Sequence, residues 1–177
     1  MIIAVDTYYF GNKAKTVGII FKDWSSETID EIVSEITICN EPYISGQFYK
    51  RELPCIKSLL ANKLKHIHQE AVEAIIVDGF CYVKDGNKYS NNYGLGGHLY
   101  DDLYGDVPIV GIAKTNLMTV NECKKAVFRG QSKKPLFVSS VGVNVDSVAL
   151  KVAKMAGNHR IPTLLKELDR LTKTDLE

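Results

Sequence analysis

The sequence predicts an α/β protein in which a mixed β-sheet is flanked by α-helices. Three observations lead to this prediction. Short β-branched runs near the N-terminus follow one another without an intervening helical segment, later apolar runs end in charged residues, and segments with helical spacing separate those later runs. A chain of 177 residues has the length of one domain with a sizeable core, so we expect residues 1–177 to form a single domain.

Three strands are predicted in the N-terminal part. Residues 2–7 and 16–22 are apolar and β-branched, and the stretch from Gly11 to Lys13 between them is typical of a hairpin connection. Residues 31–38 alternate apolar and polar side chains with a period of two, as expected of a half-buried strand. Two antiparallel strands and a third strand therefore open the fold.

Helices and strands alternate in the rest of the chain. Apolar residues recur at helical spacing between residues 47 and 66, with Pro54 in the first turns of this helix or kinking it. Continuously apolar runs at 74–79 and 108–114 favour strands that are buried on both faces of a sheet. The remaining segments predict a short glycine-containing helix at 93–103, a strand at 135–140, and helices at 143–155 and 161–171.

This order of elements is that of an RNase H-like domain, in which three strands in a meander precede alternating helices and strands. A flavodoxin-like parallel sheet is the competing architecture. It would host a small-molecule enzyme or an interaction module, and it requires a phosphate-binding glycine loop after the first strand. Tyr8, Tyr9 and Phe10 occupy that place, followed by a single glycine. The RNase H-like fold is therefore favoured.

Composition is that of a soluble globular protein, with 45% hydrophobic and 24% charged residues. No segment approaches the roughly 20 apolar residues that span a bilayer, and MIIAVDTYYF lacks the features of a signal peptide. We therefore expect a cytoplasmic protein without membrane contacts, and a monomer. The spacing of the cysteines predicts reduced, mostly buried thiols; they are Cys39, Cys55, Cys81 and Cys123.

The net charge of +1 does not indicate a polyanionic partner by itself. Basic residues do cluster in one segment, where they form either a solvated loop or an edge that contacts phosphates. The members of this cluster are Lys124, Lys125, Arg129, Lys133 and Lys134.

Charged residues at the ends of apolar strands are the first candidates for a functional site. Asp6 closes one such run and Asp78 closes another, at the edge where an open α/β sheet presents its ligand crevice. Either acid alone could merely cap a loop, but two on separate strands suit a hard divalent cation. Lys114 ends the next strand, where its ammonium either stabilises a phosphate in the same crevice or extends into solvent.

Seven segments that touch nearly the whole chain are informative together: AVDTYYF, PYISGQFYKRELP, IIVDGF, YGLGGHL, VPIVGIAKTNL, PLFVSSVG and NHRIPTLLKELDRL. In wording and in order they resemble the characteristic segments of the endonuclease V family. Each segment is weak evidence alone. The combination of PYISG, FYKRELP, VDG and GIAK is specific.

The resemblance implies an RNase H-like fold and magnesium-dependent cleavage of DNA or RNA near deoxyinosine or inosine, with manganese able to substitute. Asp6, Glu52 and Asp78 would be the metal-binding acids, and Lys114 would match the catalytic lysine. Composition alone would have made Glu52 a helix-surface acid. Asp169 is a candidate fourth metal residue, for which a helix-surface charge is the alternative.

The PYISG block would correspond to the family's wedge, which separates strands while a damaged nucleotide is turned out. Tyr43 is its natural stacking residue, beside Pro42, Ile44 and Gly46, although an ordinary loop anchor is the simpler interpretation. Gly79 in the VDG block is also expected to contact nucleic acid. His98 matches a histidine of the family, and we expect it to be packed and hydrogen-bonded rather than a ligand.

The chain departs from the family after Asp78. It reads DGFCYVKDGNKYSNNYG, where the family has a second glycine and then a His-Pro-Arg segment close to the flipped base. Two hypotheses follow. The protein either cleaves nucleic acid that contains a deaminated purine, or binds nucleic acid with lost or altered cleavage specificity.

Overall fold

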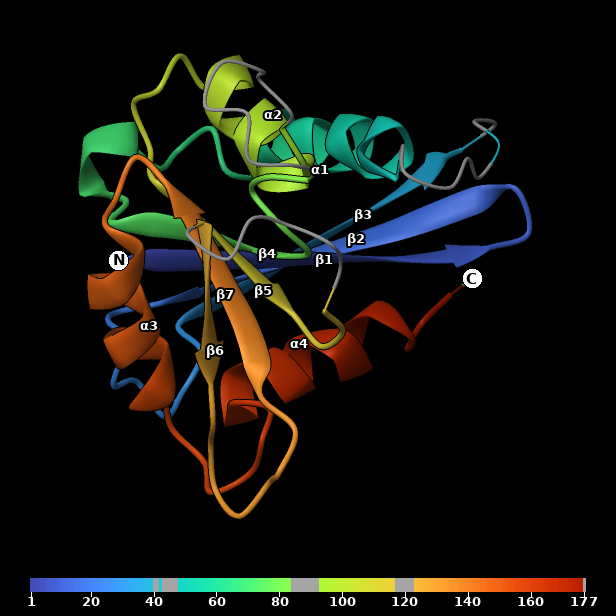
Figure 1. Cartoon of the computed structure of the whole chain (residues 1–177). Coiled ribbons are helices and arrows are strands. Elements are labelled where there is room, and N and C mark those ends of the chain that lie inside the picture. Colours follow the sequence, from blue (N-terminus) through green and yellow to red (C-terminus); the bar gives the residue numbers. More distant parts are fainter. Residues whose placement is uncertain (40–41, 43–47, 84–92, 117–122, 177) are drawn as a thin grey trace.

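A seven-stranded sheet forms the centre of the computed structural model, which describes residues 1–39, 42, 48–83, 93–116 and 123–176. The strand order is β3-β2-β1-β4-β5-β7-β6 (Figure 1). The strands are β1 (Ile2–Phe10), β2 (Lys13–Phe21), β3 (Glu31–Ile38), β4 (Ala74–Asp78), β5 (Ile109–Ala113), β6 (Lys124–Val127) and β7 (Leu136–Val141). The helices are α1 (Tyr49–Lys63), the 3-10 helix η1 (Gln69–Ala71), α2 (Leu95–Asp102), α3 (Val145–Ala153) and α4 (Thr163–Thr172).

The pairing of the strands confirms the predicted mixed sheet. β1 and β2 form an antiparallel hairpin that turns at Gly11, whose φ of 55° suits a residue without a Cβ atom, and β3 pairs antiparallel with β2. β4 is parallel to both β1 and β5, whereas β7 is antiparallel to β5 and β6. The antiparallel β1-β2-β3 meander excludes a fully parallel flavodoxin-like sheet.

Helices cover both faces of this sheet, with α1 and α2 on one side and α3 and α4 on the other (Figure 1). Side chains that alternate along β1 separate two cores. Ile2 and Ala4 are buried in the core beneath α3 and α4, whereas Ile3 and Val5 belong to the core beneath α1 and α2. The predicted helices are therefore confirmed, with bounds that differ by one to three residues, and Pro54 lies inside α1.

The strands of the β1–β2 hairpin are longer than predicted, and this changes the place of Asp6 in β1. Asp6 does not end β1, because β2 supplies backbone partners as far as the pair of Phe10 with Lys13. The parallel pairing of β1 with β4, however, stops at Val5 and Val77. Asp6 is therefore the first residue of β1 beyond the β1–β4 ladder, and it still lies where β4 ends.

The basic cluster is also different from its predicted form. Lys124 and Lys125 lie in β6, an edge strand that the sequence did not predict because its four residues include two lysines and no apolar run. Lys124 is buried and donates to Asn116 Oδ1, and Lys125 pairs with Asp146 at 2.7 Å. Arg129 is buried as well. A solvated loop describes only Lys133 and Lys134, which are exposed, whereas Lys124 and Arg129 are buried and have protein partners.

All four cysteines are free, as predicted. Two of them, Cys55 and Cys81, are buried, and the other two are partly exposed. Among the described residues, no helix combines the length and apolar character needed to cross a bilayer.

Candidate active site

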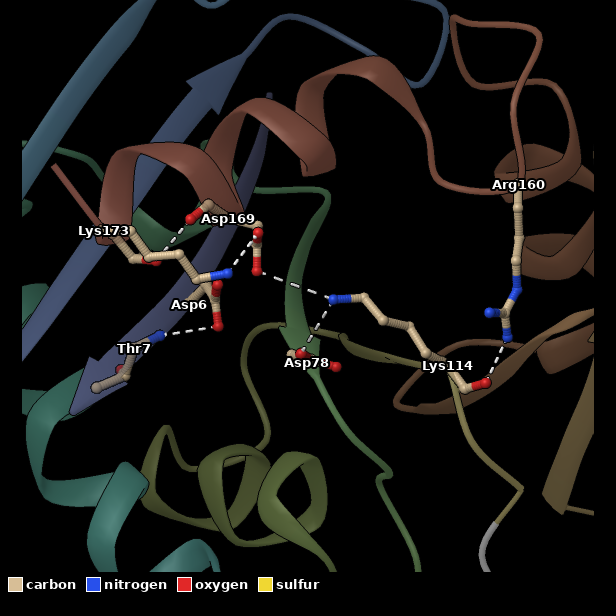
Figure 2. A network of polar contacts seen from close by, with 8 residues as sticks. Asp6, Thr7, Asp78, Lys114, Arg160, Asp169 and Lys173 are labelled. Carbon is tan, nitrogen blue, oxygen red and sulfur yellow. Dashed lines mark hydrogen bonds and ion pairs between the residues drawn. The ribbon is translucent and has the colours of Figure 1, made fainter.

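Three acids from different elements meet around one lysine (Figure 2). Asp6 lies on β1, Asp78 is the last residue of β4, and Lys114 directly follows β5. Asp169 comes from α4, on the α3–α4 face of the sheet. All four residues line one cavity of about 50 Å³, whose other walls are apolar side chains of the strands and α4. The fold thus brings together residues that are up to 163 positions apart (169 − 6).

Lys114 occupies the centre of this group. Its Nζ lies 3.9 Å from Asp78 Oδ2 and 3.9 Å from Asp169 Oδ1. Both separations exceed the length of a direct hydrogen bond, so the ammonium is attracted to both carboxylates without being locked to either. Lys114 therefore points into the acidic crevice, and the alternative of a lysine that extends into solvent does not describe it.

Asp169 is held by a second lysine that the sequence did not single out. Lys173, the residue that directly follows α4, donates from Nζ to Asp169 Oδ2 at 2.8 Å. This hydrogen bond raises the pKa of Lys173, and the nearby Asp6 and Tyr8 add to the effect. The i,i+4 spacing of an acid and a lysine on a predicted helix was the available signal. Asp169 thus lies between two ammonium groups at the site, which makes it more than a helix-surface charge.

Glu52 approaches from the opposite face of the sheet. It stands in the first turn of α1, and only 1% of its surface is exposed. Burial, with smaller contributions from Asp6 and Asp78, raises the pKa of its carboxyl well above the usual value. No described residue offers a hydrogen bond to Glu52 Oε2. Because Glu52 is buried, the interpretation of this residue as a surface acid is wrong. Burying an acid with an unpaired oxygen costs free energy, which is typical of a functional residue.

The crowding of acids also changes the pKa values of the two strand residues. Burial raises the pKa of Asp6 to about 6, and Asp78 and Asp169 contribute, against a hydrogen bond from the Thr7 N–H and the charge of Lys114. Burial likewise raises the pKa of Asp78, with Lys114 as the main opposing influence. The site therefore holds more negative charge than its lysines neutralise.

Such a set of donors suits a hard divalent cation by its chemistry. Carboxylate oxygens are the ligands that magnesium and manganese prefer, and a dication would offset both the charge crowding and the unpaired Glu52 oxygen. Within the described ranges, however, no three or more His, Cys, Asp or Glu side chains are arranged to hold an ion as they stand. The lysines lie among the acids instead. The residues fit a metal in kind, and binding requires the carboxylates to move closer together.

Arg160 is a further residue at the site to which the sequence had assigned no role. Its Nη2 donates to the backbone oxygen of Lys114 (Figure 2) and to that of Pro135 at 2.7 Å. Its Nε also donates to the Pro135 oxygen, at 3.3 Å. It therefore ties the end of β5 to the start of β7. Because Arg160 also belongs to the segment that leads into α4, it links the backbone of Lys114 to the helix that carries Asp169.

The other predicted site residues lie at the periphery or outside the described residues. Gly79 follows Asp78 with a φ of 133°, a conformation that favours glycine, and no atom blocks the space beside it. Pro42 is exposed, whereas residues 43–47, which include Tyr43, Ile44 and Gly46, fall outside the described ranges. His98 stacks on Tyr49, with ring centroids 4.0 Å apart, so it is packed as predicted.

Comparisons with known proteins agree with this architecture. A family model described as Endonuclease V matches residues 1–170. Among solved structures, endonuclease V of Ciona intestinalis, in complex with DNA containing an inosine, is 17% identical with a TM-score of 0.73, covering 99% of this chain and 84% of that one. The Bacillus subtilis endonuclease V is 21% identical (TM-score 0.69, coverage 97% and 77%), and the human enzyme is 18% identical (TM-score 0.66, coverage 97% and 82%). No curated protein matches the chain. These likenesses establish the RNase H-like fold.

Proposed function

Because this chain belongs to the endonuclease V family, we propose that it is a metal-dependent endonuclease that hydrolyses phosphodiester bonds of DNA or RNA near deoxyinosine or inosine. The observation that carries this proposal is the convergence of Asp6, Asp78 and Asp169 around Lys114. The Ciona intestinalis relative, which holds DNA containing an inosine, supports the choice of substrate. We propose that the protein acts as a cytoplasmic monomer.

Metal binding is assigned to Asp6, Glu52 and Asp78, with Asp169 as a fourth oxygen ligand. A bound magnesium ion, for which manganese could substitute, would supply Lewis-acid stabilisation of the phosphoryl oxygens. The pKa values of the first three acids are raised, so protons and the cation would compete for these carboxylates. Binding of the cation would release the protons and lower these pKa values. These carboxylates would bind the cation and determine its position.

Lys114 is assigned the stabilisation of negative charge on the reacting phosphate. Its loose attraction to Asp78 and Asp169 leaves the ammonium free to turn toward a phosphate without first breaking a tight hydrogen bond. Lys173 orients Asp169, and Arg160 holds the backbone from which Lys114 projects. Gly79 offers backbone that a strand can approach closely, because no side chain covers it.

The test is cleavage of DNA and RNA strands that carry one deoxyinosine or inosine. We expect nicking in magnesium or manganese and none in a chelator, read on a denaturing gel. Asp78→Asn should reduce the rate by at least about 100-fold, because it removes a negative ligand and the partner of Lys114. Asp106→Asn changes an exposed acid that precedes β5, at the end of this strand opposite Lys114, and it serves as the matched control that should cleave normally. Tight binding of the substrate without nicking in either metal would overturn the proposal.

The second candidate is a nucleic-acid-binding relative with lost or altered cleavage specificity. The sequence after Asp78 favours it, because the family's His-Pro-Arg segment is missing there. Binding and cleavage should be compared for inosine, uracil, abasic, mismatched and branched substrates. Equal nicking of undamaged duplex would indicate relaxed specificity, and a preference for another lesion would reassign the substrate.

A further inference from the structure

Two aromatic side chains continue along β1 from the acidic site. Asp6, Tyr8 and Phe10 alternate on one face of the strand, so they lie in a row. The rings of Tyr8 and Phe10 are nearly parallel, with 13° between their planes and 6.4 Å between their centroids. Tyr8 is 36% exposed and Phe10 is partly exposed. A pair of parallel rings therefore begins one side chain beyond the site.

The surroundings of this pair combine apolar surface with positive charge. On β2, Lys15 is the partner of Tyr8 and Lys13 is the partner of Phe10, so these side chains share the same face. Lys15 is buried, and its ammonium donates to the backbone oxygen of Thr174, whereas Lys13 is exposed. On β3, the same face continues with two exposed isoleucines, Ile36 and Ile38.

The helix that covers this face does not reach the end of the hairpin. α4 ends at Thr172, and the β1–β2 hairpin extends beyond it (Figure 1). Lys173, just after α4, donates to Asp169 and lies beside Asp6 at the acidic end of this row (Figure 2). The aromatic pair is therefore continuous with the acidic site and carries lysines at both ends.

We propose that Tyr8 and Phe10 form a stacking subsite for unpaired bases of the nucleic-acid strand that enters the acidic site. The inference rests on the proposed function and extends it to the flank of the substrate. Two residues of β-strand span about 7 Å, so Tyr8 can contact a base within about two nucleotides of a phosphate held at Asp6. Because the two ring planes are nearly parallel and both rings are at least partly exposed, a flat base can lie against the exposed part of either ring.

The chemistry of the surface favours nucleic acid over a protein partner. Stacked aromatic rings beside a basic track are the usual means of holding single strands without reading their sequence. Lys13 and Lys173 can contact phosphates while the rings contact bases, and both contacts lie in line with the acids. The subsite therefore predicts that strands with unpaired bases next to the cleaved bond bind better than fully paired duplex.

The experiment compares two labelled single strands of equal length, one with bases and one with abasic sites throughout. Binding is followed by fluorescence anisotropy in a chelator, so that no cleavage occurs. Tyr8→Leu and Phe10→Leu should each weaken binding of the base-containing strand by about 5- to 100-fold and leave binding of the abasic strand unchanged. Tyr8→Phe, which keeps the ring, should bind as the wild type does. Phe128→Leu changes an exposed aromatic residue next to β6, at the opposite edge of the sheet, and is the matched control.

Equal losses for the two strands would overturn the subsite, because they would show a general defect in folding or charge. Unchanged binding of the base-containing strand by both leucine variants would also overturn it. The outcome is independent of the proposed function, since binding is measured without metal. A wild-type protein that fails to nick inosine substrates yet loses base-dependent binding in Tyr8→Leu would leave the subsite standing and remove the nuclease proposal.

Discussion

At Asp6, the negative charge that a metal site requires lowers the stability of the folded protein. In the folded protein its pKa is raised to about 6 from 3.8, mainly by burial and then by Asp78 and Asp169. A proton on Asp6 therefore favours the folded state. Its stabilising effect is complete below about pH 4 and is lost as the pH rises through about 6. At neutral pH the charged carboxylate destabilises the metal-free fold.

Replacing Asp6 by asparagine should accordingly stabilise the metal-free protein at pH 7.5. Asparagine keeps an oxygen that can accept the Thr7 N–H but carries no charge. We expect the free energy of unfolding to rise by about 2 to 3 kcal/mol at pH 7.5 and to match that of the wild type at pH 4, as measured by urea denaturation in a chelator. A loss of stability at pH 7.5, or a gain that persists at pH 4, would contradict the assignment of the raised pKa to Asp6.

At the scale of the elements, the segment between α3 and α4 is held by hydrogen bonds from Arg129, which follows β6. The Arg129 guanidinium is buried and donates to backbone oxygens that follow the end of α3, including those of Met155, Gly157 and His159. Burial lowers the pKa of Arg129. Because this segment leads to Arg160 and α4, Arg129 supports the part of the chain that carries Asp169.

The substitution Arg129→Met should therefore destabilise the protein strongly. It leaves several carbonyl oxygens without a donor while it preserves most of the apolar bulk. We expect a loss of about 3 to 5 kcal/mol in the free energy of unfolding, and Arg129→Lys should recover only part of it because an ammonium lacks the planar fork of donors. Lys133→Met, at an exposed position of the same basic cluster, is the control and should remain within about 0.5 kcal/mol of the wild type. Similar stabilities of Arg129→Met and Lys133→Met would disprove this role.

For the whole molecule, the proposed metal ligands come from both faces of the sheet. Glu52 belongs to α1 on one face, Asp169 belongs to α4 on the other, and the two strand acids lie between them. A cation bound by all of them would connect the layers of the fold. Its binding should therefore be visible in global stability, without any nucleic acid present.

Manganese should raise the thermal midpoint of the wild type at pH 7.5. At a concentration about 100 times the dissociation constant, the gain is about 2.7 kcal/mol, which corresponds to roughly 5 to 10 °C for a chain of this size. Asp78→Asn should lose most of this shift and Asp106→Asn should retain it, as measured by differential scanning fluorimetry. An equal shift in both variants would mean that manganese binds elsewhere.

The class of the fold and most of its elements could be predicted from the sequence. Period-two alternation predicted β3, continuous apolar runs predicted β4 and β5, and helical spacing predicted α1 and α4. These predictions succeed because the side chains that an element buries recur along the sequence with the period of that element, which forms a local pattern. The same local pattern marked Asp78 and Lys114 at the ends of strands. It did not mark β6, because the segment KKAV carries two lysines and no apolar run, although its partner β7 is the next strand in the chain.

The burial, position and partners of most charged residues became clear only from the tertiary structure. Glu52 has the local pattern of a surface acid, yet packing of α1 against the sheet buries it, and Asp6 lies at the site because β4 stops beside it while β2 continues. Arg160 acquires its partners only when the segment before α4 packs against the end of β5 and the start of β7. Lys173 pairs locally with Asp169, but packing of α4 against β1 is what brings this pair to Asp6. The physical reason is that local propensity reflects short-range contacts, whereas burial, ion pairing and pKa values depend on neighbours that folding brings from other parts of the chain.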